Sequence, residues 1–411
     1  ARAGGRGGVA GGGGRDLVAR DEGRRLASRR ARRPRILSVI GTRPEAIKMA
    51  PVIGALRERG GSHHRLALTG QHTEMVDQVL DVFGLEADYD LDIMKPGQSL
   101  YDVGHACMDG LREVAEDFRP DVTIVQGDTA TVFFAGLVTF FQQGRLAHVE
   151  AGLRSHRKWS PFPEEMLRRM TDTVSDFCLA PTPAAAANLA AEGVDAERIF
   201  VTGNTVVDAL LRIRSRPLTV EEPVIARLVE SPGRLVLLTV HRRESFGAPL
   251  EGVFGAVADL ADRFGDIEIV YPVHPNPRVR EPAFRMLGGN PRVHLVEPLA
   301  YGDLLAALDR ACLVLTDSGG IQEEAPTFEV HTLVLREVTE RPEAVQAGAA
   351  TLVGTDPGRI LAEASARLSA DRSGPAVRNP YGDGRAGERI ADILLAALTG
   401  HPRRTRDWEP A

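Results

Sequence analysis

A short stretch in the second half of the chain, residues 313–326, restricts the possible folds most strongly. It begins with the mostly branched apolar run Leu-Val-Leu-Thr, which is typical of a buried parallel strand. Asp317 and Ser318 follow at a helix N-cap position, then come Gly319 and Gly320 and a helical run. Glycines let an anion approach the backbone, and a helix start presents free N–H groups. The stretch predicts an α/β protein with a phosphate site at this turn, although an ordinary strand-to-helix turn has the same pattern.

The same alternation of apolar strand and helix recurs along most of the chain. Strands are expected at residues 35–40, 64–69, 121–125, 147–150, 177–181, 199–203, 235–240, 267–271, 293–296, 313–316, 331–335 and near 351. A segment with three prolines, Pro217, Pro223 and Pro232, separates two such series and is expected to form a hinge. The prediction is two doubly wound, Rossmann-like α/β domains with a ligand-binding cleft between them.

Composition agrees with a globular protein. The 411 residues suffice for two or three domains, and 43% are hydrophobic while 26% are charged. No apolar run approaches the roughly 18 residues that a membrane span needs. Cys107, Cys178 and Cys312 lie far apart without a CxxC pair, which argues against a disulfide framework or a zinc ribbon. We therefore expect a cytoplasmic protein without a membrane partner.

The N-terminal extension differs from the rest of the chain. Residues 1–35 hold eleven arginines against three acidic residues, and glycine is frequent. We expect disorder over residues 1–34, and this segment lacks the apolar core of a signal peptide. An Arg-rich arm could contact nucleic acid or a transit receptor, but a dispensable extension is the favoured interpretation. Residues 401–411 are expected to form a C-terminal tail.

Charged residues follow several predicted strands of the first half. Arg43 and Lys48 come after the first strand, where open α/β sheets bind ligands, although both could be solvated cations. Asp128 follows a buried strand and is either a catalytic carboxylate or a helix N-cap. Glu150 closes a strand, where a glutamate has little structural use, which favours a functional role. Glu164 begins a helix, where compensation of the macrodipole is a sufficient structural reason.

Ten short motifs occur in order between residues 41 and 384, beginning with Gly-Thr-Arg-Pro-Glu-Ala-Ile-Lys-Met-Ala-Pro. They occupy residues 41–51, 71–72, 127–129, 148–154, 161–165, 201–205, 241–244, 317–326, 339–343 and 379–384. Together they resemble the bacterial non-hydrolysing UDP-N-acetylglucosamine 2-epimerases over roughly residues 35–398. No single motif is decisive, but ten in register are highly specific.

The resemblance implies a domain organisation. It suggests a GT-B-like fold with an N-terminal domain at 35–205, a UDP-binding domain at 206–382, and a helix at 383–400 that packs back on the N-terminal domain. It also implies a homodimer, with neither a metal ion nor a cofactor. No nucleic-acid partner is expected.

The resemblance further implies a reaction, the reversible inversion of C2 that interconverts UDP-GlcNAc and UDP-ManNAc. The C2 proton is not adjacent to a carbonyl, so its direct removal is difficult. Cleavage of the C1–O bond makes C1 oxocarbenium-like and C2–H acidic, as in glycosidic transition states. Proton loss then gives 2-acetamidoglucal and UDP, and UDP adds again with protonation on the opposite face.

The roles of individual residues follow from the same resemblance. Asp128, Glu150 and Glu164 match an acidic trio that transfers protons, and mutual repulsion is expected to raise at least one of their pKa values. His241 matches a histidine placed at the departing UDP. The expected substrate-binding residues are Arg43, Lys48, Ser318, Gly319, Gly320 and Arg341 for the diphosphate and Glu324 for the ribose. Gln71 and His72 match part of a second, allosteric UDP-GlcNAc site.

Two segments depart from the family pattern. Leu167 stands where the family usually has Asn, and residues 327–332 replace its usual Ser-Leu-Gly-Lys-Pro-Val. Three alternatives stay open: a hydrolysing epimerase that releases ManNAc and UDP, a GT-B glycosyltransferase, and a non-catalytic UDP-sugar-binding protein. The two departures would fit the last of these.

Overall fold

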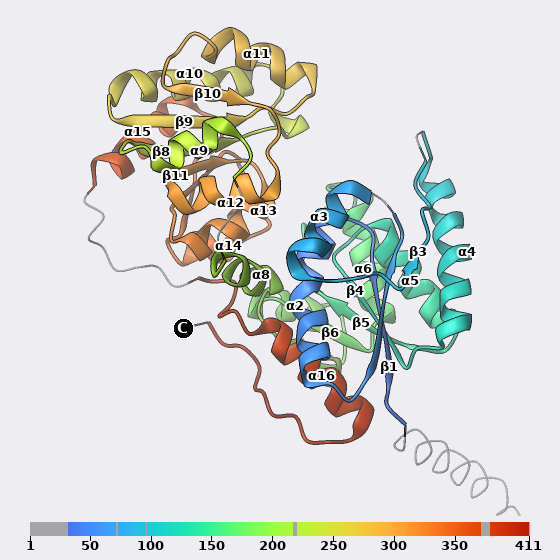
Figure 1. Cartoon of the computed structure of the whole chain (residues 1–411). Helices are drawn as coiled ribbons and strands as arrows, with labels where there is room; N and C mark the ends of the chain where they lie inside the picture. The colour runs from blue at the N-terminus through green and yellow to red at the C-terminus, as the bar shows by residue number, and fades with distance from the viewer. Residues whose placement is uncertain (1–31, 71–72, 96, 217–219, 371–378, 411) are drawn as a thin grey trace, which may run out of the picture.

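The protein is described by a computed structural model that covers residues 32–410 except 71–72, 96, 217–219 and 371–378 (Figure 1). Most of the predicted N-terminal extension therefore lies outside the described residues. The same is true of the two residues predicted for an allosteric site, Gln71 and His72.

The first domain is built around a parallel sheet with the order β3-β2-β1-β4-β5-β6-β7. Its strands are β1 (Arg35–Ile40), β2 (His63–Leu68), β3 (Tyr89–Asp90), β4 (Val122–Gln126), β5 (Arg145–Val149), β6 (Phe177–Ala180) and β7 (Ile199–Val201). Central strands are buried along their length, as β4 is at every residue, because helices cover both faces of the sheet. This is why their sequences are continuous apolar runs rather than alternating patterns.

The second domain repeats the arrangement with the parallel order β10-β9-β8-β11-β12-β13. Its strands are β8 (Arg234–Thr239), β9 (Ile267–Pro272), β10 (Val293–Val296), β11 (Ala311–Thr316), β12 (Thr332–Val334) and β13 (Ala350–Leu352). The predicted fold class, two doubly wound α/β domains, is thereby confirmed.

Helices connect the strands in both domains (Figure 1). The first domain contains α2 (Arg43–Arg59), α3 (Thr73–Phe83), α4 (Leu100–Phe118), α5 (Ala130–Phe141), α6 (Glu164–Val174), α7 (Pro183–Ala191), η1 (Ala196–Arg198) and α8 (Thr205–Arg214). The later part contains α9 (Pro223–Glu230), η2 (Arg243–Ser245), α10 (Ala248–Arg263), α11 (Pro277–Leu287), α12 (Tyr301–Arg310), α13 (Gly319–Glu324), η3 (Ala325–Phe328), α14 (Pro342–Gln346), α15 (Pro357–Ser369) and α16 (Ala386–Thr399). Over the described residues, no helix is both long and apolar enough to cross a membrane.

The last helix, α16, lies beside α2 of the first domain, although the two are far apart in sequence (Figure 1). Asp392 on α16 forms an ion pair with Arg59 at the end of α2. Gly387 lies so close to the carbonyl of Pro51 that an added Cβ would be only 2.7 Å from its oxygen. The chain therefore returns to its first domain after completing the second.

The strand orders locate the ligand site. In each sheet the order reverses direction between two central strands, β1 and β4 in the first domain and β8 and β11 in the second. Ligands of open α/β sheets bind beyond the carboxyl ends of the strands at this switch point. Four predicted segments follow these strands, beginning at Arg43, Asp128, His241 and Asp317.

Candidate active site

Charged residues of the two domains meet in a chain of ion pairs. Lys48 Nζ on α2 lies 2.6 Å from Glu150 Oε2, just after β5, and 2.9 Å from Glu323 Oε2 on α13. Glu323 Oε1 in turn lies 2.6 Å from Arg341 Nε. We call Lys48, Glu150, Glu323 and Arg341 the interdomain ion cluster. It brings three predicted site residues together and adds Glu323, which we did not predict.

Burial and pairing set the charges of this cluster. Burial alone would lower the pKa of Lys48, but Glu150 and Glu323 outweigh it and raise the pKa above its ordinary value. Burial would likewise raise the pKa of Glu323, yet Arg341 and Lys48 lower it to about 2. The pKa of Glu150 is raised, first by burial, against the opposing effect of Lys48. Glu150 is therefore the carboxylate of the cluster that holds a proton most readily.

Glu150 also has an unusual backbone conformation. Its φ is +70°, a left-handed conformation that costs a non-glycine residue roughly 1 kcal/mol. Its amide donates to the carbonyl of Leu179, 3.0 Å away, and its side chain accepts from Gln126 Nε2 at 2.6 Å. Such strain is maintained where surrounding structure determines the geometry, and it occurs often at functional sites.

Asp128 follows β4 and projects from the adjacent turn. Its carboxylate forms an ion pair with Arg168 on α6, and its side chain is 31% exposed. The alternative that Asp128 caps α5 is wrong, because Thr129 is the N-cap and accepts from the amide of Val132. Helix capping was the structural alternative to a catalytic role for Asp128, and Asp128 does not cap the helix.

Two adjacent glutamates at the start of α6 have different surroundings. Glu165 is fully buried and accepts hydrogen bonds from the amides of Ser155 and His156, so it holds the preceding loop. Glu164 is half-buried, and its Oε2 is buried without a hydrogen-bond partner in the described part of the chain. An unpaired buried carboxylate oxygen is costly and requires an explanation. A ligand-facing role for Glu164 would supply one.

The predicted rise in pKa through mutual repulsion of Asp128, Glu150 and Glu164 has a different cause here. The rise at Glu150 comes first from burial, and the carboxylate that adds to it is Glu323. Burial, rather than repulsion within the trio, is therefore the main cause of the raised pKa of Glu150.

His241 follows β8 in the second domain. The amides of His241 and Arg242 donate to Asp317 Oδ2 at 2.9 and 2.8 Å, and His241 Nδ1 lies 3.6 Å from Asp317 Oδ1. The ring stacks on that of His274, with centroids 5.4 Å apart and planes at 7°. Burial lowers the pKa of His241, and His274 lowers it further, against the effect of Asp317. His274 is itself exposed and lies after β9, so its ring extends the predicted site at His241.

The predicted phosphate turn has the expected strand–turn–helix form. β11 ends at Thr316, whose Oγ1 accepts from the amide of Ser318 at 2.9 Å, and α13 starts at Gly319. Residue 319 is a glycine for a steric reason, because a Cβ added there would lie 2.6 Å from Arg341 Nη1. For Gly320 an added Cβ would meet only the Ser318 side chain, 3.8 Å away. The turn thus brings Gly319 and Arg341 into contact.

Tyr301 connects two further predicted residues, Arg43 of the first domain and Glu324 of the second. The Arg43 guanidinium lies over the ring of Tyr301, 5.9 Å from its centroid, and the Tyr301 hydroxyl donates to Glu324 Oε1 at 3.4 Å. Burial raises the pKa of Glu324 to about 7, and Glu323 contributes to the rise. This second contact between the domains adjoins the interdomain ion cluster through α13.

The comparisons with known proteins agree with this geometry. A family model described as UDP-N-acetylglucosamine 2-epimerase matches residues 54–395. The UDP-N-acetylglucosamine 2-epimerase of Escherichia coli K12 is 45% identical over 368 residues, which cover 88% of this chain and 98% of that protein. The chain belongs to the UDP-N-acetylglucosamine 2-epimerase family. The membership predicted from ten motifs is confirmed.

Solved structures of relatives share the fold. The S. aureus MnaA–UDP co-structure superposes with a TM-score of 0.82 at 40% identity, covering 92% of this chain and 100% of that one. The UDP-GlcNAc 2-epimerase from Neisseria meningitidis bound to UDP-GlcNAc has a TM-score of 0.78 at 39% identity, covering 88% and 99%. The epimerase-family fold therefore extends over both domains.

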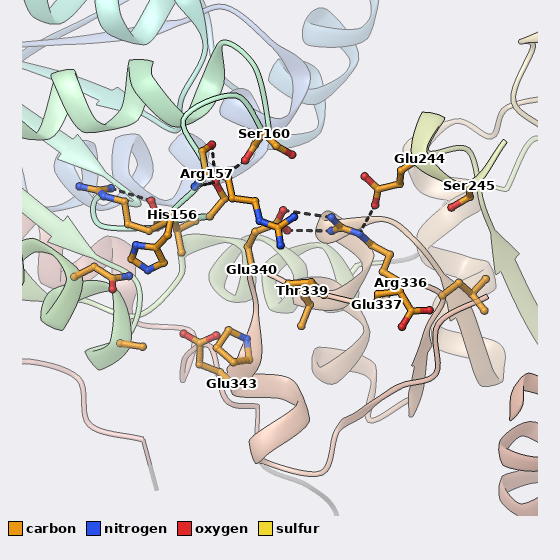
Figure 2. A pocket seen from close by; sticks show the side chains of 18 of the residues that line it. His156, Arg157, Ser160, Glu244, Ser245, Arg336, Glu337, Thr339, Glu340 and Glu343 are labelled. Atoms are coloured by element: carbon orange, nitrogen blue, oxygen red, sulfur yellow. Dashed lines mark hydrogen bonds and ion pairs between the residues drawn. The ribbon is translucent and has the colours of Figure 1, made fainter. Parts of the chain in front are cut away.

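A pocket of about 600 Å³ adjoins the site of this family member between the domains (Figure 2). The loop at 153–160 and α7 form one wall, and the segment 335–343 forms the other. Figure 2 shows Arg336 paired with Glu244 and Glu340, at 2.8 and 3.0 Å. These contacts lie within the second domain, whereas Thr182 Oγ1 at the start of α7 donates to Glu343 Oε1 at 2.7 Å and joins the two walls.

The two departures from the family pattern are both ordered. Leu167 is half-buried on α6, directly before Arg168. Within the segment 327–332, Glu329 adopts φ +59°, and His331 Nε2 lies 2.9 Å from Thr351 Oγ1. Among the described residues, no group of three or more His, Cys, Asp or Glu is arranged to hold a metal ion.

Several residues of the site were not predicted from the sequence. They are Gln126, Arg168, His274, Glu323 and also Glu45, which accepts from Thr129 Oγ1 next to Asp128 at 2.8 Å. Glu323 and Glu45 stand inside motifs that carried the family resemblance, so a signal was present. The motifs do not show in which direction each side chain points. Glu323 and Glu324 are adjacent in the sequence, and only the structure shows which of them contacts Lys48.

Proposed function

We propose that this chain is a non-hydrolysing epimerase that interconverts UDP-GlcNAc and UDP-ManNAc. The strongest support is the interdomain ion cluster, which sets a carboxylate of raised pKa, Glu150, beside cations of both domains. Proton transfer at C2 needs such a carboxylate, and departure of a diphosphate needs cations. The relative from N. meningitidis bound to UDP-GlcNAc supports the substrate.

The reaction starts with elimination. The bond between C1 and the β-phosphate oxygen breaks, and its electron pair leaves with UDP. A carboxylate removes the C2 proton, and the C–H electron pair forms the C1=C2 bond of 2-acetamidoglucal. The reverse addition joins the UDP oxygen to C1 while a second carboxylate delivers a proton to the opposite face of C2. Asp128, Glu150 and Glu164 are the carboxylates that we propose for these transfers.

The remaining residues hold the nucleotide. Arg43, Lys48 and Arg341 would neutralise the diphosphate, with the backbone of Ser318–Gly320 nearby. His241 would act at the departing phosphate oxygen, and Glu324 would accept hydrogen bonds from the ribose. The lowered pKa of His241 makes it neutral near pH 7, so a neutral N–H donor is its expected form. We also propose a homodimer, which light scattering would test.

Proton NMR of the purified protein with UDP-GlcNAc in D2O tests the proposal. The expected result is UDP-ManNAc with deuterium at C2 and no free sugar. Free ManNAc with UDP would instead identify a hydrolysing enzyme. An unchanged spectrum, with UDP-GlcNAc binding confirmed by calorimetry, would show a binding protein without turnover and refute the proposed activity.

A further inference from the structure

A buried histidine–aspartate pair lies directly behind the proposed carboxylates. His148 on β5 and Asp172 on α6 are both almost completely buried. His148 Nδ1 lies 2.6 Å from Asp172 Oδ1, and His148 Nε2 lies 2.7 Å from the carbonyl oxygen of Gly127. Neither residue touches the interdomain ion cluster, and neither has a part in the steps proposed above.

Both partners of the imidazole are acceptors. The Gly127 carbonyl can only accept, and Asp172 also receives Arg154 Nη2 at 2.7 Å and the amide of Gly152 at 3.2 Å. Burial alone would raise the pKa of Asp172, but His148 and Arg154 outweigh it and the pKa lies below its ordinary value. An ionised Asp172 accepts at both oxygens, so both ring nitrogens of His148 face acceptor atoms.

The two ends of this pair reach the backbone beside two proposed carboxylates. Gly127 immediately precedes Asp128, and its φ of +88° sets the direction in which the chain leaves β4. Gly152 comes two residues after Glu150, in the turn whose left-handed conformation begins at Glu150. The buried pair of His148 and Asp172 thus binds the carbonyl of Gly127 in one turn and the amide of Gly152 in the other.

Stability alone does not explain the pair. Burying an ionised carboxylate costs desolvation energy that its partners offset only with good geometry, and well-packed apolar residues often serve as well. Specific hydrogen bonds to two backbone groups give the pair a use that an apolar substitute lacks. The pair adds side-chain bonds to a backbone bond that already joins the two strand ends, in which the Gly127 amide donates to the Val149 carbonyl at 3.1 Å.

We propose that His148 and Asp172 are positioning residues, which set the relative placement of Asp128 and Glu150 through the backbone of their turns. The inference rests on the proposed function, because the placement matters for proton transfer at C2. It predicts that losing the bond to Gly127 slows proton transfer more than it weakens nucleotide binding. A misplacement of about 1 Å can reduce a rate by about 100-fold.

Two substitutions separate the two bonds of His148. The amide of asparagine occupies the place of Nδ1, so His148→Asn keeps the bond to Asp172 and loses the one to Gly127. The amide of glutamine occupies the place of Nε2, so His148→Gln keeps the bond to Gly127. We expect kcat to fall by about 100-fold in His148→Asn and clearly less in His148→Gln, with KM and UDP affinity unchanged.

The kinetic isotope effect with UDP-GlcNAc deuterated at C2 distinguishes positioning from a loss of folding. It should rise in His148→Asn, because proton transfer limits the rate more strongly. His294→Asn is the matched control, since His294 Nε2 pairs with Glu268 at 2.6 Å in the second domain. That variant should leave kcat and the isotope effect unchanged. Equal losses in both His148 variants, or an unchanged isotope effect, would overturn the proposal.

Hydrogen–deuterium exchange provides a test that does not need turnover. In full-length His148→Asn, amide exchange should accelerate in peptides that span Gly127 and Gly152, while peptides of the second domain stay unchanged. If the wild-type protein fails to epimerise UDP-GlcNAc, the proposed function fails and this local acceleration alone decides the positioning role. Uniform acceleration over the chain, or none at the two turns, would refute it.

Discussion

The turns after β4 and β11 occupy equivalent places in the two domains, and each contains an aspartate. Asp128 is 31% exposed and pairs with a side chain, Arg168, from a neighbouring helix. Asp317 is completely buried and accepts two backbone amides, those of His241 and Arg242. One aspartate is therefore partly exposed and paired with a side chain, whereas the other holds the loop that carries His241.

The difference teaches that position in the fold does not by itself assign chemistry. Both aspartates stand at a topological switch point, where ligand-binding residues are expected. What separates them is the local backbone: Gly127 lets the chain turn before Asp128, whereas Asp317 continues directly from β11 and lies under the loop after β8. A buried carboxylate that accepts hydrogen bonds from two backbone N–H groups has a structural role. A partly exposed carboxylate in an ion pair can exchange that partner for another.

The strongest test of the comparison is Asp128→Asn. We expect kcat for UDP-GlcNAc epimerisation to fall by about 100- to 10,000-fold, because the amide cannot take or give the proton. UDP affinity by calorimetry and the melting temperature should stay close to wild type. A large loss of stability would instead give Asp128 the same structural role as Asp317.

A pH-dependent effect should appear at Glu45, which accepts from Thr129 Oγ1 beside Asp128, 2.8 Å away. Burial raises the pKa of Glu45 to about 7, above the 4.5 of an exposed glutamate. The folded state therefore binds more protons than the unfolded state between these values, and stability falls as pH rises through this window.

Glu45→Gln removes that dependence. The stability of the variant relative to wild type should increase from pH 5 to pH 7, by at most about 1.4 kcal/mol per pH unit. Urea unfolding at several pH values measures this difference. A difference that stays constant with pH would show that Glu45 has an ordinary pKa in the folded protein.

Asp317→Asn tests the structural half of the comparison. The amide oxygen can still accept from the loop, but the charge is lost and an N–H group faces His241. We expect a loss of about 1–3 kcal/mol in the free energy of unfolding. UDP affinity should fall as well, because the His241 loop loosens. Unchanged stability together with a collapse of kcat would assign Asp317 to the chemistry instead.

The smallest expected effect concerns Glu329, which ends η3 in the helical segment after Asp317. Its φ of +59° is unfavourable for a residue with a side chain, and glycine adopts it readily. Glu329→Gly should stabilise the protein by up to about 1 kcal/mol. Glu329→Ala is the control for loss of charge and should give no gain in urea unfolding. An equal gain in both variants would point to charge rather than backbone conformation.

The fold was largely predictable, because buried parallel strands appear as continuous apolar runs. The strand expected at 313–316 is the carboxyl-terminal part of β11, Ala311–Thr316. β3 escaped prediction because two residues, Tyr89–Asp90, carry no periodicity. The ends of helices and strands are equally hard to predict from sequence patterns. Hydrogen bonds to neighbouring strands decide where each strand begins and ends.

Only part of the candidate site was predictable in its residues, and its pairings were not. Sequence motifs pointed to Lys48, Glu150 and Arg341, yet they could not show that Glu323 connects Lys48 to Arg341 across two domains. The helix-start pattern alone could not separate Glu164 from Glu165, since both suit the first turn of a helix, and only the match to the family trio selected Glu164. The structure adds the physical difference, because Glu165 accepts hydrogen bonds from a loop.

The sequence by itself determined the two-domain α/β architecture and the family, because hydrophobic runs and ordered motifs are local properties of the chain. Only the tertiary structure decided which charges meet. Ion pairs such as Lys48–Glu323 join residues more than 270 positions apart, and their pKa values depend on burial that no local pattern records. The same physics separates Asp128 from Asp317: both follow a buried strand in the sequence, and packing alone leaves the first partly exposed and buries the second completely.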